Sequence, residues 1–240
     1  FFAAGVALAP FSTFERLNEI SPNPFSCFYR LQDQYLLCAS PERFIRKQGD
    51  RLLSQPIKGT AARFPEDPEK DAQAKQCLYQ DPKERTENVM IVDLVRNDLS
   101  QVCQEGSVQV DELFGVYAFP QVYQLISTIS GRLKPGAGLP EILQALFPMG
   151  SMTGAPKQRV MQLIEQYEHT RRGLFSGAVG YLQPDGNMDF NVVIRSLQYN
   201  AATQYLNYLV GSGITFYSDP EKEYAECLLK AAAMRRVLEG

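Results

Sequence analysis

Lys58 is the side chain in this sequence best suited to covalent chemistry. It lies in the stretch Gln55–Thr60, with Pro56 and Ile57 before it and a Gly-Thr pair after it. Apolar surroundings disfavour a charged ammonium group, so a lysine held there can supply a neutral amine as a nucleophile. The alternative reading of the same residues is an ordinary surface lysine that follows a strand.

Two pairs of glutamates form a second candidate site. Glu84 and Glu87 are three residues apart in an expected helix, and they extend the apolar stripe of that helix. Glu223 and Glu226 repeat this spacing in an expected terminal helix, where Lys230 continues the same face. Because carboxylate oxygens are the ligands that Mg²⁺ prefers, the two pairs could converge on one such ion. The alternative is two helices whose glutamates face water.

Three further features suit a negatively charged ligand. The loop over residues 147–157 enters a helix, and its backbone N–H groups, a hydroxyl and Lys157 could hold an anion. The alternative is a tight turn, and the spacing does not match a Walker A loop. Gly211 and Gly213 form a flexible corner whose N–H groups could approach a carboxylate. Arg195 stands in an otherwise apolar strand pattern, where an arginine usually pairs with a carboxylate.

Composition narrows the class of protein. The 240 residues are 45% hydrophobic and 21% charged with a net charge of −3, as in ordinary globular proteins. The absence of a long basic run argues against nucleic acid or an anionic membrane as a partner. The only histidine, His169, lies in a polar stretch and is expected to be a solvated helix-end residue, which argues against Ser-His-Asp and Cys-His machinery. The five cysteines lack Cys-x-x-Cys spacing, and we expect reduced core residues of a cytoplasmic protein.

The start of the chain does not read as a targeting segment. Its apolar stretch, residues 1–11, is too short to span a bilayer and has no basic leader or cleavage site. The chain also begins with phenylalanine rather than methionine. We therefore expect a part of a longer polypeptide, with residues 1–240 forming one domain.

Grouped strands separated by helices predict an α+β fold. The predicted strands are residues 25–30, 35–39, 44–47, 52–57, 107–113, 122–133, 174–182, 188–198 and 203–210. The predicted helices are residues 68–79, 83–97, 139–147, 156–167 and 219–238.

Six ordered blocks together resemble the chorismate-utilising enzymes, a family that includes anthranilate, isochorismate, salicylate and aminodeoxychorismate synthases. The resemblance covers nearly the whole chain. The blocks are Ser-Pro-Glu-Arg-Phe at 40–44, Pro-Ile-Lys-Gly-Thr-Ala-Ala-Arg at 56–63, residues 83–99, residues 150–157, Ile-Arg-Ser-Leu at 194–197, and residues 211–214 followed by Glu-Tyr-Ala-Glu at 223–226. It implies two β-sheets packed as a sandwich with helices outside, as in anthranilate synthase component I, with an N-terminal part absent.

The resemblance also implies roles for individual residues. Glu87 and Glu226 would bind Mg²⁺ directly, and Glu84 and Glu223 would act through water. Glu42 would be the general acid that protonates the departing C4 hydroxyl of chorismate. The residues implied in holding the substrate are Gly59, Thr60, Thr153, Arg195, Gly211, Gly213 and Lys230.

Lys58 separates the members of this family. Anthranilate synthases usually carry alanine at this place, whereas lysine in Pro-Ile-Lys-Gly-Thr is similar to the aminodeoxychorismate synthases of folate biosynthesis. Those are transferases that the resemblance pairs with a glutamine amidotransferase supplying ammonia. Asn88 and Gln124 stand where many relatives have histidine, and the absence of histidine at position 124 fits a product that is not aromatised. The alternatives are another synthase of the family, for anthranilate or isochorismate, or a non-catalytic chorismate-binding protein.

Overall fold

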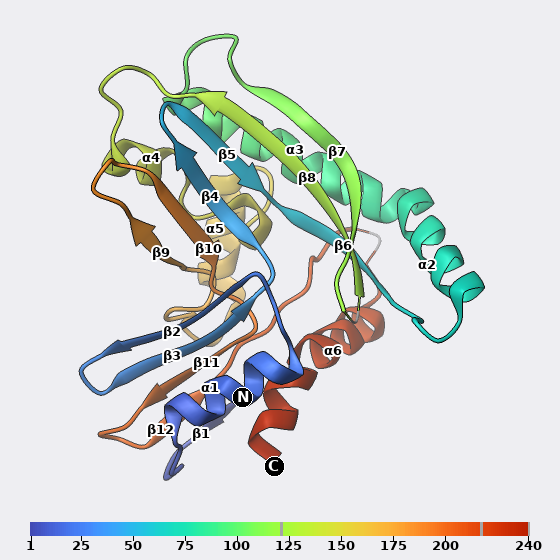
Figure 1. Cartoon of the computed structure of the whole chain (residues 1–240), viewed down its shortest axis with the longest axis vertical. Helices are drawn as coiled ribbons and strands as arrows, with labels where there is room; N and C mark the ends of the chain where they lie inside the picture. The colour runs from blue at the N-terminus through green and yellow to red at the C-terminus, as the bar shows by residue number, and fades with distance from the viewer. Residues whose placement is uncertain (121, 217, 240) are drawn as a thin grey trace. The chain divides into compact units, whose positions relative to one another are not determined.

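The computed structural model describes residues 1–120, 122–216 and 218–239 (Figure 1). The chain divides into two compact units. Unit 1 comprises Phe1–Pro41, Arg172–Ala178 and Val192–Gly240, and unit 2 comprises Glu42–Arg171 and Val179–Asn191. Each unit is built around a β-sheet with helices, which confirms the predicted α+β class.

Unit 1 contains a five-stranded antiparallel sheet in the order β1-β12-β11-β3-β2. Its strands are β1 (Phe2–Ala3), β2 (Phe25–Leu31), β3 (Gln34–Ser40), β11 (Ser196–Asn200) and β12 (Tyr205–Asn207). Its helices are α1 (Pro10–Ile20) and α6 (Pro220–Glu239). Leu17 of α1, Leu37 of β3, Leu197 of β11 and Met234 of α6 are fully buried in one core. Both helices therefore pack on this sheet.

Unit 2 contains a seven-stranded sheet in the order β6-β8-β5-β4-β10-β9, with β7 also paired to β8. Its strands are β4 (Arg43–Gln48), β5 (Arg51–Gln55), β6 (Ile57–Ala62), β7 (Gln109–Ala118), β8 (Val122–Arg132), β9 (Ala178–Leu182) and β10 (Met188–Val192). Strands β5 and β6 both pair with β8, one after the other. Strand β8 is buried along most of its length, so it forms the centre of unit 2.

Unit 2 has four α-helices and one short 3₁₀ helix among its described residues. They are α2 (Pro68–Gln80), α3 (Pro82–Val102), α4 (Leu139–Leu146), the short 3₁₀ helix η1 (Gly150–Met152) and α5 (Lys157–Tyr167). Helix α3 packs on β6, β7 and β8, beside which it runs in Figure 1. It begins at Pro82, and the Asp81 carboxylate accepts hydrogen bonds from the N–H groups of Lys83 and Glu84. This cap fixes the first turn of α3.

Two predicted strands are each split in the structure. The strand predicted over residues 52–57 ends at β5, and β6 resumes after Pro56. Proline has no N–H to donate, but its carbonyl accepts a hydrogen bond from Ser127 N of β8 at 3.3 Å. The strand predicted over residues 188–198 is divided into β10 and β11, which lie in different sheets. The break includes Arg195, whose φ of +50° is incompatible with a continuous strand.

The cysteines are all free, as predicted, but not all are core residues. Cys38 and Cys103 are buried, whereas Cys77 is exposed. Burial raises the pKa of the Cys103 thiol to about 11. The described helices include none long and apolar enough to cross a membrane.

Candidate active site

Lys58 lies at an irregularity in β6. Ile57 pairs with Ile126 of β8, and Thr60 pairs with Gln124. Between these two pairs β6 advances by three residues, whereas β8 advances by two. The extra residue makes a β-bulge, a feature that often re-aims a side chain beside an active site. The bulge includes Gly59, whose φ is +105°. A side chain at position 58 thereby leaves the regular alternation of the strand.

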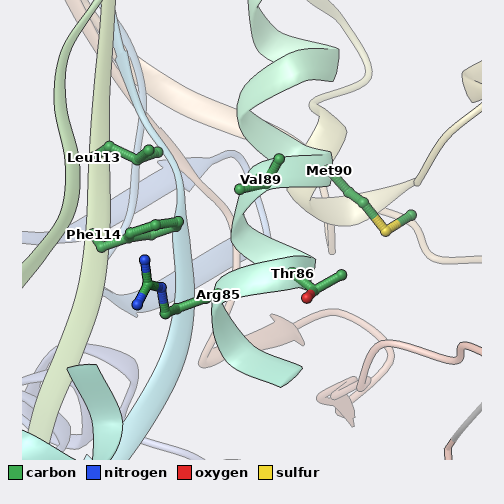
Figure 2. Close-up of a pocket in the computed structure, with 6 residues that line it drawn as sticks. All are labelled: Arg85, Thr86, Val89, Met90, Leu113 and Phe114. Atoms are coloured by element: carbon green, nitrogen blue, oxygen red, sulfur yellow. The ribbon is translucent and has the colours of Figure 1, made fainter. Parts of the chain in front are cut away.

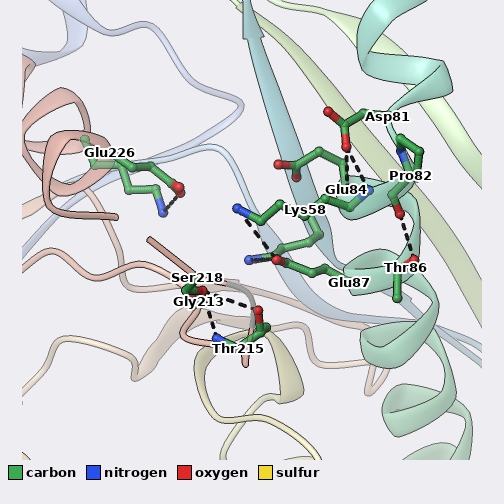
Figure 3. Close-up of polar contacts among 12 residues, drawn as sticks. Lys58, Asp81, Pro82, Glu84, Thr86, Glu87, Gly213, Thr215, Ser218 and Glu226 are labelled. Carbon is green, nitrogen blue, oxygen red and sulfur yellow. Dashed lines mark hydrogen bonds and ion pairs between the residues drawn. The ribbon is translucent and has the colours of Figure 1, made fainter. Parts of the chain in front are cut away.

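The amine of Lys58 contacts Glu87 of α3. Lys58 Nζ is 2.6 Å from Glu87 Oε2, and Figure 3 shows the two side chains pointing toward each other. The side chain of Lys58 is 25% exposed, whereas Glu87 is buried. Lys58 is therefore not the free surface lysine that its local sequence also allowed.

Glu87 has two oxygens with different surroundings. Oε2 takes the ion pair with Lys58, while Oε1 is buried with no hydrogen-bond partner in the described part of the chain. Lys83 Nζ lies 3.9 Å from Oε1. A buried carboxylate oxygen without a hydrogen bond is costly. Oε1 can therefore still accept a hydrogen bond or bind a cation.

Glu84 stands beside the same pair, one helical turn before Glu87 (Figure 3). A Cβ built on Gly59 would lie 3.1 Å from Glu84 Oε2, so the carboxylate covers the bulge of β6. Burial raises the pKa of Glu84 above its ordinary value, Lys58 lowers it, and the negative charge of Glu87 raises it. The two carboxylates thus gather around one lysine in unit 2, as their helical spacing predicted for one face.

A second cluster, centred on Asp71, holds the end of β6. Its carboxylate accepts hydrogen bonds from Tyr123 Oη at 2.6 Å, Phe64 N at 2.8 Å and Arg63 Nη2 at 3.0 Å. The hydrogen bond from Arg63, followed by those from Tyr123 and the Phe64 N–H, holds the pKa of Asp71 well below its usual range. Sequence reasoning noted Arg63 in its block but missed Asp71. An aspartate in the first turn of α2 reads as a helix-start residue.

Glu42, the predicted general acid, is buried just before β4. Its neighbour Arg43 binds both carboxylate oxygens of Asp189 on β10, at 2.9 and 3.0 Å, and donates to Gln55 Oε1. Strand β4 carries its own bulge here, since Arg43 and Ile45 pair with consecutive residues of β10. Arg43 thus fixes the strand end from which the Glu42 side chain extends.

Two predicted substrate-holding residues of unit 2 have simple surroundings. Thr60 is exposed on β6. Thr153 follows η1 and donates its hydroxyl hydrogen to the Met149 carbonyl at 3.1 Å. Both positions leave hydroxyl oxygen lone pairs available to accept a hydrogen bond.

The loop over residues 147–157 was predicted as a candidate anion site, and the structure corrects the part assigned to Lys157. The Lys157 ammonium is paired with Asp98 of α3 and also donates to the Leu146 carbonyl. The cation of this loop is therefore used to join α3, α4 and α5. The pKa of Asp98 is nonetheless raised, because the effect of its burial exceeds that of Lys157.

The remaining predicted residues lie in unit 1. Lys230 Nζ contacts Glu226 Oε1 at 2.6 Å and donates to the Gly211 carbonyl at 2.9 Å, so it ties α6 to the preceding loop. Glu223 is buried one turn earlier in the same helix. The spacing of Glu226 and Lys230 on α6 thus brings a carboxylate and an ammonium together, and the ammonium contacts the glycine corner.

The glycine corner is closed by Ser218. Its hydroxyl donates to the Gly213 carbonyl at 3.3 Å and accepts a hydrogen bond from Thr215 N at 2.9 Å (Figure 3).

Arg195 has a left-handed backbone conformation that is uncommon for arginine. Such strain tends to occur at functional positions.

Asn88 and Gln124, where the family resemblance implies histidine in many members, are both buried. Asn88 of α3 accepts a hydrogen bond from the Ser127 hydroxyl at 2.6 Å. Gln124 of β8 is 1% exposed, and its Oε1 has no hydrogen-bond partner among the described residues. Asn88 serves the packing of α3 on β8, whereas Gln124 retains an unused acceptor.

The residues present fit a hard divalent cation. The donors are carboxylates, and Glu87 keeps one buried oxygen without a hydrogen bond. Within either unit, the described residues include no group of three or more His, Cys, Asp or Glu side chains placed to hold a metal ion. The predicted ligands Glu84 and Glu87 belong to unit 2, and Glu223 and Glu226 belong to unit 1. A site shared by the two pairs stays a prediction.

An open apolar groove of about 380 Å³ lies between α3 and β7 (Figure 2). Val89, Met90 and Leu113 line it together with Phe114, and Arg85 stacks over the Phe114 ring at 4.8 Å. The groove has no carboxylate lining it, so it is separate in character from the Lys58 cluster.

The chain is similar to known proteins in both sequence and structure. The family model described as chorismate binding enzyme matches residues 2–236. The chain is 44% identical over 227 residues to aminodeoxychorismate synthase component 1 of Salmonella typhimurium, covering 95% of this chain and 49% of the relative. It is 40% identical over 231 residues to an anthranilate synthase component 1 of Haloarcula marismortui, covering 96% and 47%.

A solved structure has the same fold. The crystal structure of anthranilate synthase component I from Streptococcus pneumoniae matches with a TM-score of 0.85 and 34% identity, covering 98% of this chain and 51% of that one. The chain thus spans about half the length of the curated relatives that it matches.

Proposed function

Because this chain belongs to the chorismate binding enzymes, we propose that it carries the chorismate-converting site of an aminodeoxychorismate synthase. Such an enzyme is a transferase that makes 4-amino-4-deoxychorismate from chorismate and ammonia. The observation that carries the proposal is the position of Lys58. A bulge in β6 directs this side chain at Glu84 and Glu87 of α3. The aminodeoxychorismate synthase component 1 of Salmonella typhimurium, which is 44% identical to this chain over the aligned residues, supports the proposal.

The proposed reaction uses Lys58 as a nucleophile and Glu42 as a general acid. The amine of Lys58 forms a bond to C2 of chorismate, both conjugated ring double bonds shift, and the C4 hydroxyl leaves as water with a proton from Glu42. Ammonia then attacks C4, both double bonds shift back, and the amine of Lys58 departs. The proton that the new amine loses restores Glu42. The sum is chorismate plus ammonia giving aminodeoxychorismate plus water.

We assign the four glutamates to Mg²⁺. Glu87 and Glu226 would bind the ion directly, and Glu84 and Glu223 would hold it through water. When bound, the ion would neutralise and anchor the ring carboxylate of chorismate. The bare oxygen of Glu87 supports the assignment, because that oxygen is buried and has no hydrogen bond in the described part of the chain.

Seven residues are assigned to holding the substrate. Arg195 and Lys230 would pair with its carboxylates, and the other five would contribute backbone groups or hydroxyls. These five are Gly59, Thr60, Thr153, Gly211 and Gly213. The hydrogen bond of Lys230 to Gly211 supports a shared role for that ammonium and the glycine corner.

Ammonia would come from a glutamine amidotransferase partner. The word component in the name of the Salmonella typhimurium relative supports a further subunit. We place the protein in the cytoplasm, in para-aminobenzoate and folate synthesis, in keeping with its free cysteines.

Product analysis of the full-length protein tests this function. With chorismate, ammonia and Mg²⁺, we expect 4-amino-4-deoxychorismate by mass spectrometry. Release of anthranilate and pyruvate would show that the protein is an anthranilate synthase instead. Formation of isochorismate would show that it is an isochorismate synthase. Unchanged chorismate would favour a binding protein without catalysis.

Mass spectrometry of the protein itself tests the covalent step. Incubation with chorismate and Mg²⁺, but no ammonia, should add a chorismate-derived mass to the peptide that contains Lys58. Lys58→Ala should abolish that mass, and Lys47→Ala should retain it, because Lys47 bonds to the Gly186 carbonyl instead of a carboxylate. An adduct of equal yield in the Lys58→Ala protein would contradict the assigned nucleophile.

A further inference from the structure

Glu87 is the meeting point of the nucleophile and the metal in the proposed site. Its Oε2 is 2.6 Å from Lys58 Nζ, although the carboxylate is also the direct metal ligand of that proposal. The pair is shielded from water, since the Glu87 side chain is 9% exposed and that of Lys58 25%. In this state Lys58 supplies most of the positive charge that the buried carboxylate requires.

We propose that Lys58 and a divalent cation exclude each other at the carboxylate of Glu87, so that metal binding releases the Lys58 side chain toward the substrate. This exchange rests on the proposed function, because it takes Glu87 as a metal ligand. It adds an order of events: Lys58 is held on Glu87 until the site is loaded, and only then can it reach chorismate.

Distance is the first argument for exclusion. A Mg²⁺ ion lies about 2.1 Å from its carboxylate oxygens, so an ion on either oxygen of Glu87 would lie within a few ångströms of Lys58 Nζ. Like charges that close repel strongly where water is scarce. Lys83 already stands 3.9 Å from Oε1 and adds to the positive charge. The doubly charged ion is the stronger competitor once carboxylates from several elements bind it.

The second argument is that Lys58 can leave. It extends from a bulge rather than from regular strand, and Gly59 beside it carries no side chain that would block a rotation. Glu84 covers the bulge, and its carboxyl oxygens remain available to either cation. Exchange therefore requires a new rotamer of one lysine, with the strand and helix unchanged.

Metal binding to the full-length protein tests the exchange directly, without substrate. Titration calorimetry with Mg²⁺ should show about tenfold tighter binding to Lys58→Met than to the wild type, a typical size for coupling between two sites. Lys58→Arg keeps a cation on Glu87 and should bind Mg²⁺ no more tightly than the wild type. Lys47→Met removes the same charge away from Glu87 and should leave the affinity unchanged.

Chemical labelling provides the second readout. An amine-acylating reagent should modify the Lys58 peptide faster when Mg²⁺ is present than when it is absent. In Glu87→Gln, labelling should be fast without Mg²⁺ and should not respond to it, because the ion pair is already broken.

The outcomes separate this inference from the function it rests on. Equal Mg²⁺ affinity in the wild type and Lys58→Met, or no Mg²⁺ binding by either, would overturn the exchange. Tighter binding by Lys58→Met supports the exchange even if the enzyme releases anthranilate, in which case the proposed function alone fails.

Discussion

Gly59 sets how closely β6 approaches the turn of α3 that carries Glu84 and Glu87. An added Cβ would lie 3.1 Å from Glu84 Oε2, 3.1 Å from Leu125 Cβ and 3.3 Å from Leu78 Cδ1. These contacts are tight on three sides, and the φ of +105° disfavours any residue with a side chain. Glycine at this position thus lets the bulge that carries Lys58 lie directly beneath a carboxylate.

Gly59→Ala should lower the free energy of unfolding by more than the about 1–3 kcal/mol that a strained backbone position usually costs, because the added Cβ also meets three closely placed atoms. The displaced Glu84 should also weaken Mg²⁺ binding. Urea unfolding and titration calorimetry measure the two effects. Gly136→Ala is the matched control, because Gly136 has a φ of +82° but no atom within 4 Å of an added Cβ. Equal losses of stability and of metal binding in both variants would contradict the role of these contacts.

At the scale of elements, Asp71 joins three of them. It stands in the first turn of α2, it accepts hydrogen bonds from Arg63 and Phe64 just after β6, and it accepts one from Tyr123 of β8. Arg63 also lies over the Tyr123 ring at 5.1 Å. This cluster anchors the end of β6 opposite to the bulge, so that the strand holds its register on β8.

Asp71→Asn should lower the urea midpoint at pH 7, by an amount that shrinks as the pH falls. The folded protein lowers the pKa of Asp71, so the carboxylate contributes stability above its unfolded pKa of about 3.9, and loses it as the pH falls toward the folded pKa. Urea titrations of both proteins between pH 7 and pH 3 measure this. Tyr123→Phe keeps the Arg63 contact and should retain part of the pH dependence. A constant difference between wild type and Asp71→Asn would refute the account.

Local sequence signals were sufficient for most elements, and the exceptions have physical causes. Apolar periodicity predicted a helix over residues 83–97, and α3 runs from Pro82 to Val102. The split at Pro56 was missed, because an apolar run hides the place where one strand passes its pairing to the next. The split at Arg195 was missed because nothing in the local sequence requires a positive φ for arginine.

The candidate site was predictable to the same degree. Helical spacing alone placed Glu84 and Glu87 on one face, and the structure shows both beside Lys58. The contact of Lys58 with Glu87 was not predictable, since it depends on the bulge in β6 and on the packing of α3 against that strand. Asp71 was missed because its partners are distant in sequence, with Tyr123 being 52 residues away.

At the scale of the whole molecule, the two units are interleaved along the chain. Unit 1 is assembled from three segments and unit 2 from two, so the chain passes between them four times. Unfolding unit 1 would release both ends of each segment of unit 2. We therefore expect the two units to unfold in a single cooperative transition, as small domains usually do.

Met234→Ala tests this coupling, because Met234 is fully buried in unit 1. Such a truncation should lower the free energy of unfolding by about 2–5 kcal/mol, and the free energy of unfolding of unit 2 should fall by the same amount.

Each unit has a buried thiol as a reporter, Cys38 in unit 1 and Cys103 in unit 2. The raised pKa of Cys103 further suppresses its reaction in the folded state. Pulsed thiol labelling along a urea gradient, read by peptide mass spectrometry, gives a midpoint for each. Leu229→Ala, on the same helix but 71% exposed, should leave both midpoints nearly unchanged. A shift confined to Cys38 would show that the units unfold independently despite their interleaved chain.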